Sequence, residues 1–488
     1  MTSDLSPRRL GRRDVLKLLA AGSAGLVAVA CSPAAAPAPT AAPKAIEASK
    51  PAAPAAPAAT TAPAAQAPAA TAAPKAAWDW KKYSGKKVRV LVPTNTACDF
   101  VEPNLKEFTA LTGIEVNWEK LAEAQQRQKL QVELTSGMSD VDLFGSHAGQ
   151  QGAAFSAAGW YEPLDSWINN KDLTNPDWDQ ADFDANVLKQ LGAVNDKLIG
   201  ILMFAITFPL FYRKDLFQQA GLAVPKTFDE MEAAAAKLTD KAKTQFGMFL
   251  RGVPADSVGV WPAFLHNFGG TWLTPDGKAQ VNSADSVASI QFYGRMASTY
   301  GPPGIINQSW TQLRDLFCQG KGAMFCDSSS IVTNFENPKT STVVDKVGYA
   351  LLPGGKAGQN PAINGWLWSM YSKSKNKEAS WFFIQWAASK DMEARMQRAG
   401  ITQPRKSAWQ DAQFQKDFGA KHPDLTETLM QSYAKGKAFL YPPFVNVAEA
   451  RTTYGEVIAA AIQGQDVQKA ADAAQAKLLD QQKREAAG

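Results

Sequence analysis

Histidine and cysteine are scarce in this chain of 488 residues, which contains 3 histidines and 4 cysteines. Neither a His-Glu-x-x-His pair nor a Cys-x-x-Cys pair occurs, so the sequence gives no local support for a zinc site. Ser146 lies one position too early in the run 145–149 to form the Gly-x-Ser-x-Gly turn of many hydrolases. We therefore expect no catalytic residue, no metal and no cofactor.

Net positive charge is missing from most of the chain. The formal charge is +5 overall, but residues 78–488 contain 43 Lys and Arg against 43 Asp and Glu. Nucleic-acid binding depends on basic groups that neutralise phosphates. The balance predicts a small molecule or a protein as partner, and no nucleic acid.

A hydrophobic run long enough to span a bilayer is also missing. Residues 18–30 are apolar but number only 13, and Arg12 and Arg13 precede them. This pattern predicts a signal peptide over residues 1–30. The paired arginines favour twin-arginine export, although Val15 stands where phenylalanine is usual, which leaves the Sec route open. Cys31 follows a lipobox-like run, so we expect it to carry a lipid; the alternative is a secreted protein with an incidental cysteine.

Residues 31–77 are expected to form a disordered tether behind that lipid anchor. About half of residues 32–77 are alanine and about a fifth are proline, and such a composition buries too little to repay the entropy of ordering. The tether would hold a soluble part off the membrane, on the outer face of the cell membrane or in the periplasm.

Strands and helices alternate at the start of that soluble part. Strands are predicted near 87–92, 113–118 and 141–144, with helices over 103–113 and 120–136 between them. This alternation is typical of an α/β fold with a parallel sheet covered on both faces. Ligands of such sheets bind beyond the carboxyl ends of the strands, which places Asn95 and His147 near a candidate site.

A second α/β lobe is predicted further along. Residues 198–212 contain two strand-like runs interrupted around 205–207, and we interpret them as the crossing between lobes. Thr227 and Ser309 each begin a capping box that opens a helix. Strands near 247–251, 322–326 and 347–352 belong to the second lobe, and a mostly helical tail runs to residue 484.

Several motifs, in order, closely resemble the family 1 extracellular solute-binding proteins, the carbohydrate receptors of bacterial ABC importers. The matching segments are 211–217, 220–222, 225–230, 235–238, 267–270, 320–325, 347–355, 374–379 and 464–467. The resemblance implies a type II periplasmic-binding-protein-like fold, with two discontinuous α/β lobes joined by a multi-strand hinge. We place the crossovers near 203–208, 354–360 and 402–406. Lobe 1 is then 78–203 plus 360–402, and lobe 2 is 208–354 plus 406–488.

Tryptophans are the first candidate ligand-binding residues, because a flat aromatic face suits the C–H side of a sugar ring. Trp366 and Trp368 are two apart on a predicted strand and face the same side. Trp261 begins a helix at which the family often presents an aromatic side chain. For each of them, burial in the core is the alternative.

Polar and hinge positions complete the candidate set. Asp327 is expected either to accept sugar hydroxyl protons or to cap the following helix. Phe204, Thr207 and His147 match cleft positions of the family, with a structural histidine as the alternative for His147. Arg405 follows Pro404 at a frequent family position, with a surface ion pair as its alternative.

The function implied by the resemblance is capture of a sugar, oligosaccharide or polyol by lobe closure. A monomeric receptor would deliver this solute to the permease subunits and, through them, to the ATPase of an ABC importer, without covalent chemistry. Two alternatives stay open: a receptor for a quaternary ammonium or polyamine, and a lipid-anchored glycosidase. After lipidation three cysteines are left, and Cys318 and Cys326 are either a disulfide or two separate buried thiols.

Overall fold

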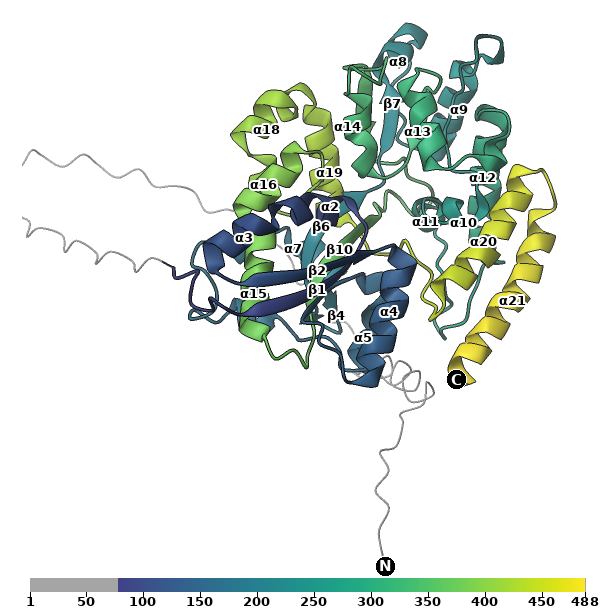
Figure 1. Cartoon of the computed structure of the whole chain (residues 1–488). Helices are drawn as coiled ribbons and strands as arrows, with labels where there is room; N and C mark the ends of the chain where they lie inside the picture. The colour runs from purple at the N-terminus through teal and green to yellow at the C-terminus, as the bar shows by residue number, and fades with distance from the viewer. Residues whose placement is uncertain (1–77, 488) are drawn as a thin grey trace, which may run out of the picture. The chain divides into compact units, whose positions relative to one another are not determined.

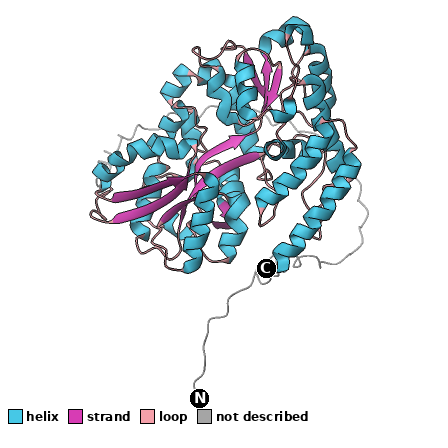
Figure 2. Cartoon of the chain, turned by 45° about the vertical axis from the view of Figure 1, so that its right-hand side comes forward, coloured by secondary structure: helices cyan, strands magenta, loops and turns pink. Residues whose placement is uncertain are grey.

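The computed structural model describes residues 78–487, which form two α/β lobes (Figures 1 and 2). The predicted signal peptide over 1–30, lipidated Cys31 and the tether over 31–77 lie outside the described residues. Within residues 78–487, no helix combines the length and the apolar character that crossing a membrane requires.

The sheet of lobe 1 has five strands in the order β2-β1-β3-β10-β6. β1 is parallel to β2 and β3, whereas β10 runs antiparallel to β3 and β6. The expected parallel sheet is thus mixed, because β6 leads the chain out of lobe 1 and β10 brings it back. The strands are β1 (Lys87–Pro93), β2 (Glu115–Leu121), β3 (Leu143–Ser146), β6 (Ile201–Thr207) and β10 (Ile363–Met370), with a separate hairpin of β4 (Ala193–Val194) and β5 (Lys197–Leu198).

Helices cover both faces of the five-stranded sheet. Trp118 and Glu119 are neighbours on β2 and therefore point to opposite faces. Trp118 packs on Phe383 of α15 with ring centroids 6.3 Å apart, whereas Glu119 pairs with Lys129 of α4. The helices of this lobe are α2 (Thr96–Val101), α3 (Leu105–Thr112), α4 (Glu123–Ser136), α5 (Ala153–Ala157), α6 (Asp165–Ile168), α7 (Ala185–Gly192), α15 (Lys377–Ala387) and α16 (Lys390–Arg398).

Lobe 2 contains a small antiparallel sheet, β8-β7-β9, made of β7 (Leu210–Arg213), β8 (Met324–Cys326) and β9 (Val347–Ala350). The strand expected near 247–251 does not form a full ladder. It makes only isolated parallel bridges, from Phe246 to Gly322 and from Phe249 to Phe325. The helices around this sheet are α8 (Lys214–Ala220), α9 (Phe228–Leu238), α10 (Pro254–Ser257), α11 (Trp261–Asn267), α12 (Ala284–Tyr300), α13 (Trp310–Cys318), α14 (Val332–Phe335), α20 (Val447–Ile462) and α21 (Val467–Ala487).

Local helix signals behave as the sequence predicts. Both capping boxes are present: Thr227 and Glu230 exchange hydrogen bonds at the start of α9, and Ser309 and Gln312 do so at the start of α13. Gly113 ends α3 with φ at 72°, a conformation that favours glycine.

The break between the two strand-like runs of 198–212 lies later than expected, at the end of the predicted crossover 203–208. β6 continues through Thr207, which pairs with Ile363 of β10, so the interruption predicted around 205–207 is wrong. The break falls at Phe208 and Pro209, because proline has no N–H to donate to a ladder.

The crossing near 402–406 is hydrogen-bonded to the first crossing between the lobes. The backbone N–H of Ala205 donates to Thr402 O at 3.1 Å. The chain then forms α17 (Lys406–Trp409), α18 (Ala412–Asp417) and α19 (Pro423–Lys435). Helix α19 contacts β9 of lobe 2 as well as α7 and β6 of lobe 1. The proposed lobe boundaries therefore meet at a helix that both lobes share.

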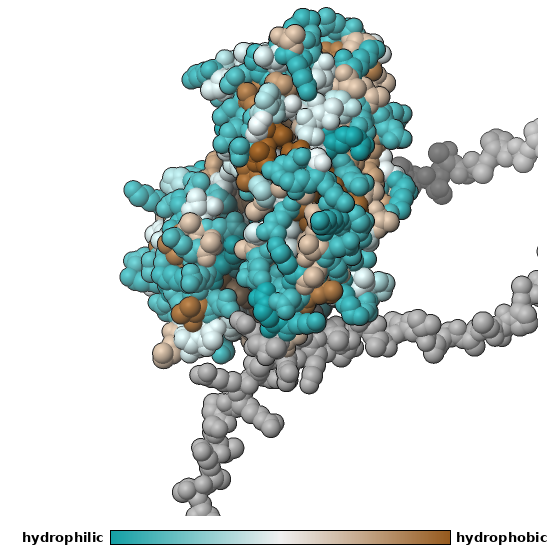
Figure 3. Space-filling view, turned by 90° about the vertical axis from the view of Figure 1, so that its right-hand side faces the viewer, coloured by the Kyte–Doolittle hydropathy of each residue, from teal (hydrophilic) through white to brown (hydrophobic). Residues whose placement is uncertain are grey.

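Large exposed apolar side chains are few among the described residues. The side of the molecule that carries α21 is mainly hydrophilic, with small hydrophobic patches (Figure 3). All three cysteines of the described part, Cys98, Cys318 and Cys326, are buried and free, so the disulfide alternative is wrong.

Candidate functional site

Five side chains meet where the two lobes face each other, and we call them the interlobe cluster. His147 directly follows β3, and Asn364 and Trp366 belong to β10. Tyr441 lies in the loop before α20, and Arg451 is on α20 itself. Lobe 1 thus contributes a strand end and a central strand, and lobe 2 contributes a loop and a helix.

His147 is the centre of the interlobe cluster. Its ring is edge-on to Trp366 and Tyr441, with centroids 5.6 and 4.9 Å away. Its Nε2 contacts Asn364 Oδ1. The guanidinium carbon of Arg451 lies 5.8 Å from the centre of the Tyr441 ring. Tyr441 therefore connects the cation of lobe 2 to the imidazole of lobe 1.

Three buried polar atoms without partners belong to the interlobe cluster or to a residue beside it. His147 Nδ1, Gln151 Nε2 and Arg451 Nε have no hydrogen-bond partner among the described residues. Gln151 belongs to the same site, because its Oε1 accepts from the His147 backbone N–H at 2.9 Å. Buried polar groups in proteins are normally satisfied. A bound molecule with several hydroxyl groups could supply the missing partners.

Burial keeps the titratable rings of the interlobe cluster neutral. It lowers the pKa of His147, against the opposing effect of the Asn364 side chain. It raises the pKa of the Tyr441 phenol, against the opposing effects of Arg451 and of the Asn364 and Gln150 side chains. At neutral pH these two groups therefore offer uncharged donors and acceptors, which suit an uncharged polar solute.

Three further candidates from the sequence lie on or near the same strands. Phe204 pairs with Trp366 in the β6–β10 ladder. Thr207 Oγ1 donates to Ala362 O at 2.9 Å. Asn95 caps α2, its Oδ1 accepting from the Cys98 N–H at 2.8 Å. Of these, only Phe204 directly neighbours the interlobe cluster.

Two of the predicted tryptophans are core residues in this structure. Trp368 is fully buried, with its ring centroid 6.1 Å from Trp118. Trp261 is also fully buried, and its indole N–H donates to Ser289 Oγ at 3.0 Å. Trp366 is the one of the three predicted tryptophans that the structure brings to the interlobe cluster.

Asp327 is fully buried and its carboxylate is held by Arg251. Arg251 Nε donates to Asp327 Oδ2 at 2.8 Å, and Nη2 donates to Oδ1 at 2.5 Å. Burial opposes the charge on Arg251, but the Asp327 carboxylate outweighs it and raises the pKa of Arg251. The cap of the following turn is Ser328, whose Oγ accepts from the Ser330 N–H, so the helix-cap interpretation of Asp327 is wrong.

Arg405 is buried, and the alternative of a surface ion pair is wrong. Its guanidinium carbon lies 3.8 Å from the centre of the Phe183 ring, and Nη1 donates to Asp182.

Sequence reasoning did not single out Asn364, Tyr441 and Arg451, which the structure places in the interlobe cluster. Two prolines follow Tyr441 and exclude a helix there, which was the available signal of a fixed loop. Nothing in the sequence shows that this loop reaches His147.

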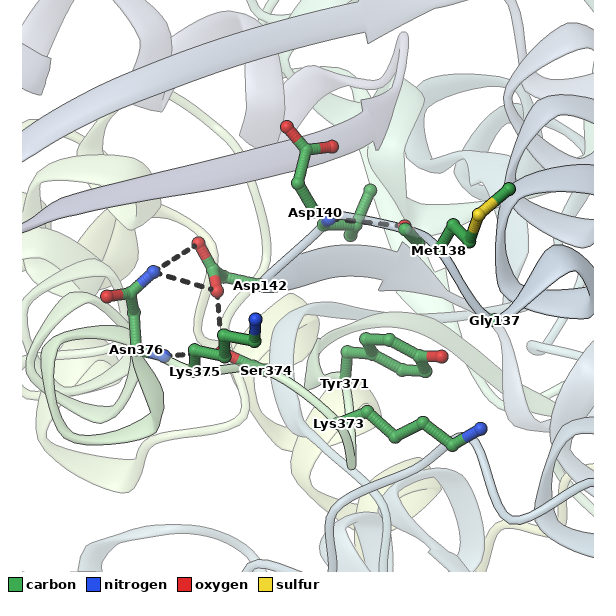
Figure 4. A pocket seen from close by; sticks show the side chains of 11 residues that line it. Gly137, Met138, Asp140, Asp142, Tyr371, Lys373, Ser374, Lys375 and Asn376 are labelled. Atoms are coloured by element: carbon green, nitrogen blue, oxygen red, sulfur yellow. Dashed lines mark hydrogen bonds between the residues drawn. The ribbon is translucent and has the colours of Figure 1, made fainter.

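The cavity drawn in Figure 4 lies elsewhere in lobe 1. It has a volume of about 410 Å³ and is lined by residues 137–142 and by 371 and 373–376. These residues precede β3 and follow β10, at the end of the sheet opposite His147. Its Asp142 carboxylate already accepts from the Arg89 N–H at 2.9 Å and from Ser374 Oγ at 2.6 Å. Because ligands of such sheets bind at the carboxyl ends of the parallel strands, we assign this cavity no ligand.

The model of one protein family, described as bacterial extracellular solute-binding protein, matches residues 99–394. The chain belongs to this family of solute-binding proteins. The resemblance identified from the sequence motifs is thereby confirmed, and membership implies export from the cytoplasm.

Relatives of this solute-binding protein differ in the solutes they are named for. This chain is 27% identical over 406 residues to a probable amino-acid ABC transporter periplasmic-binding protein of Sinorhizobium fredii. The match covers 82% of this chain and 90% of the relative. It is 28% identical over 347 residues to an erythritol/L-threitol-binding protein of Mycolicibacterium smegmatis, covering 66% of this chain and 71% of the relative.

Solved structures confirm the two-lobed fold. An ABC transporter solute-binding protein from Agrobacterium radiobacter, solved in complex with ribitol, aligns with a TM-score of 0.71 at 28% identity, over 81% of this chain and 99% of that chain.

Proposed function

We propose that this chain is a receptor that binds a polyol or small sugar between its lobes and delivers it to the permease of an ABC importer. The observation that carries the proposal is the set of buried, unpaired polar atoms at the interlobe cluster, on His147, Gln151 and Arg451. A polyol carries one hydroxyl on each carbon, so it can donate to and accept from several such atoms at once. The relative named for erythritol and L-threitol and the structure in complex with ribitol support the same solute class.

The mechanism is binding without covalent change. The site groups come from both lobes, so a solute contacts all of them only when the lobes are closed. Solute binding then shifts the population toward the closed form, which the permease recognises. No catalytic role is assigned to any residue, and the ATPase supplies the energy of transport.

Attachment to the membrane through a lipid on Cys31 is the second part of the proposal. It is supported by the sequence pattern before Cys31 and by the long Ala/Pro segment after it. Replacing Cys31 with alanine should release the protein from the membrane fraction, and mass spectrometry of the mature N-terminus should find the acyl groups. A soluble, unmodified mature protein would contradict the anchor.

The test of the solute is thermal unfolding of the full chain against four-, five- and six-carbon polyols, sugars, amino acids, quaternary amines and polyamines. A solute at 100 times its Kd should raise the free energy of unfolding by about 2.7 kcal/mol. We expect polyols or sugars to do so and to be recovered chemically intact. Stabilisation by amino acids or amines alone would show that the solute is not a polyol or sugar. Consumption of a sugar would show that the protein is an enzyme.

The variant Tyr441→Phe tests whether the solute binds at the interlobe cluster. It removes one hydroxyl while keeping the ring that packs on His147, so solute affinity should fall about tenfold with little change in unfolding temperature without solute. Tyr212→Phe is the matched control, because Tyr212 lies on β7 of lobe 2, outside the interlobe cluster. Equal affinities of the two variants would place the solute elsewhere.

A further inference from the structure

Three potential metal ligands come together in lobe 2, outside the interlobe cluster. Glu336 directly follows α14, Asp345 lies in the loop before β9, and His422 directly precedes α19. One ligand atom of each lies within 4.8 Å of the other two. We call these three residues the lobe 2 triad.

His422 is buried and its imidazole is not hydrogen-bonded. Its side chain is 2% exposed, and Nδ1 is a buried atom without a hydrogen-bond partner among the described residues. Nε2 faces Glu336 Oε2 at 3.7 Å, which is too long for a hydrogen bond. The rings of Phe418 and Tyr349 pack against the imidazole, with centroids 4.5 and 5.9 Å away, and fix its direction.

Among the described residues, the carboxylates of the lobe 2 triad pair with no lysine or arginine. Within residues 78–487, neither Glu336 nor Asp345 forms an ion pair with a lysine or arginine, although many other carboxylates do. A third carboxylate, Asp424, accepts the Tyr349 N–H at 3.0 Å.

We propose that Glu336, Asp345 and His422 bind a divalent transition metal ion of the zinc type. Ligand bonds of 2.0–2.2 Å in tetrahedral geometry put neighbouring ligand atoms about 3.3–3.6 Å apart, close to the 3.7 Å between His422 Nε2 and Glu336 Oε2. One imidazole and two carboxylates suit Zn²⁺, and water completes the four ligands.

Neighbouring groups already orient the Glu336 carboxylate. The Tyr349 hydroxyl donates to Oε1 at 3.3 Å, and the backbone N–H of Asp345 donates to Oε2 at 2.8 Å. Such outer contacts to a ligating carboxylate are usual at metal sites. The ion would tie the loop before β9 to the ends of α14 and α19, so its role is structural stabilisation of lobe 2.

The experiment uses the full chain, freed of metal by a chelator and titrated with Zn²⁺ or Co²⁺. We expect one equivalent to bind, the unfolding temperature to rise, and Co²⁺ to give the visible absorption of a tetrahedral site. The chain has only 3 histidines, so imidazole NMR signals can be assigned, and only those of His422 should shift with Zn²⁺.

Glu336→Gln and Asp345→Asn should each weaken Zn²⁺ binding at least tenfold, whereas Asp315→Asn, a control on α13 of the same lobe, should not. The alternative is a triad without an ion, in which His422 Nε2 and Glu336 Oε2 simply face each other. Absence of saturable binding, unchanged affinity in both triad variants, or a shift of another histidine would each overturn the proposal. The Co²⁺ spectrum and the NMR shift of the unmodified chain decide the question if a variant fails to fold.

Discussion

Replacing Arg251 with methionine tests the buried ion pair with Asp327 in lobe 2. The Asp327 carboxylate is 0% exposed and accepts two hydrogen bonds from this guanidinium. Methionine fills part of the space but leaves a buried charge without a partner. Removal of one member of such a pair costs about 3–5 kcal/mol, so we expect Arg251→Met to lower the free energy of unfolding by about that amount.

The double variant Arg251→Met with Asp327→Asn separates the effect of the buried charge from the effect of packing. Asparagine keeps the Oδ1 acceptor for the Ser328 N–H, which donates at 2.7 Å, but carries no charge. The double variant should therefore recover at least half of the lost stability. The assay is urea unfolding followed by far-UV circular dichroism, with solute affinity measured on the same samples.

Two results would refute this reasoning. A loss below about 1 kcal/mol for Arg251→Met would mean that water reaches Asp327, as at an exposed ion pair. A double variant no more stable than Arg251→Met would mean that packing, not charge, holds the pair. If Asp327→Asn alone abolished solute binding at unchanged stability, Asp327 would contact the solute, as the sequence suggests.

Two pH effects of opposite sign follow from buried groups. Burial, with some repulsion from Lys437, lowers the pKa of His266 to about 4 from 6.5, so folding should lose stability as the pH falls from 6.5 to 4, and His266→Gln should reduce this loss. Burial raises the pKa of Glu393 to about 8 from 4.5, against the opposing effect of Arg405, so the folded state keeps a proton that the unfolded chain has released. Stability should therefore fall as the pH rises from 4.5 to 8, and Glu393→Gln should flatten that part of the curve. Urea unfolding at several pH values measures both, and an unchanged slope in either variant would contradict its assignment.

Local features of the fold could be predicted because they depend on neighbours in sequence. The capping boxes at Thr227 and Ser309 and the left-handed Gly113 each involve only a few consecutive residues. The direction of β10 could not be predicted in this way, since it follows from the path of the chain through lobe 2 and back. The break between β6 and β7 was misplaced because pairing with Ile363 keeps Thr207 in the sheet.

The candidate site was harder to predict, because the same residue type serves the core and the interlobe cluster. Nothing in the sequence distinguishes Trp261 from Trp366. Trp261 donates to Ser289 within lobe 2, whereas the Trp366 ring packs on His147. Only tertiary packing separates them. Arg405 was equally ambiguous, since its burial depends on Phe183, which is more than two hundred positions earlier in the chain.

Strand β10 contributes both to the core of lobe 1 and to the interlobe cluster. Trp368, toward its carboxyl end, is fixed in the core of lobe 1, whereas Asn364 and Trp366 reach the interlobe cluster. The pairing of β10 with β6 shifts register between Trp366 and Leu367. Such irregularities re-aim side chains beside functional sites. Because Trp368 anchors the strand in lobe 1, the half of β10 that contains Asn364 and Trp366 keeps its position in that lobe, beside the contact of His147 with Tyr441 of lobe 2.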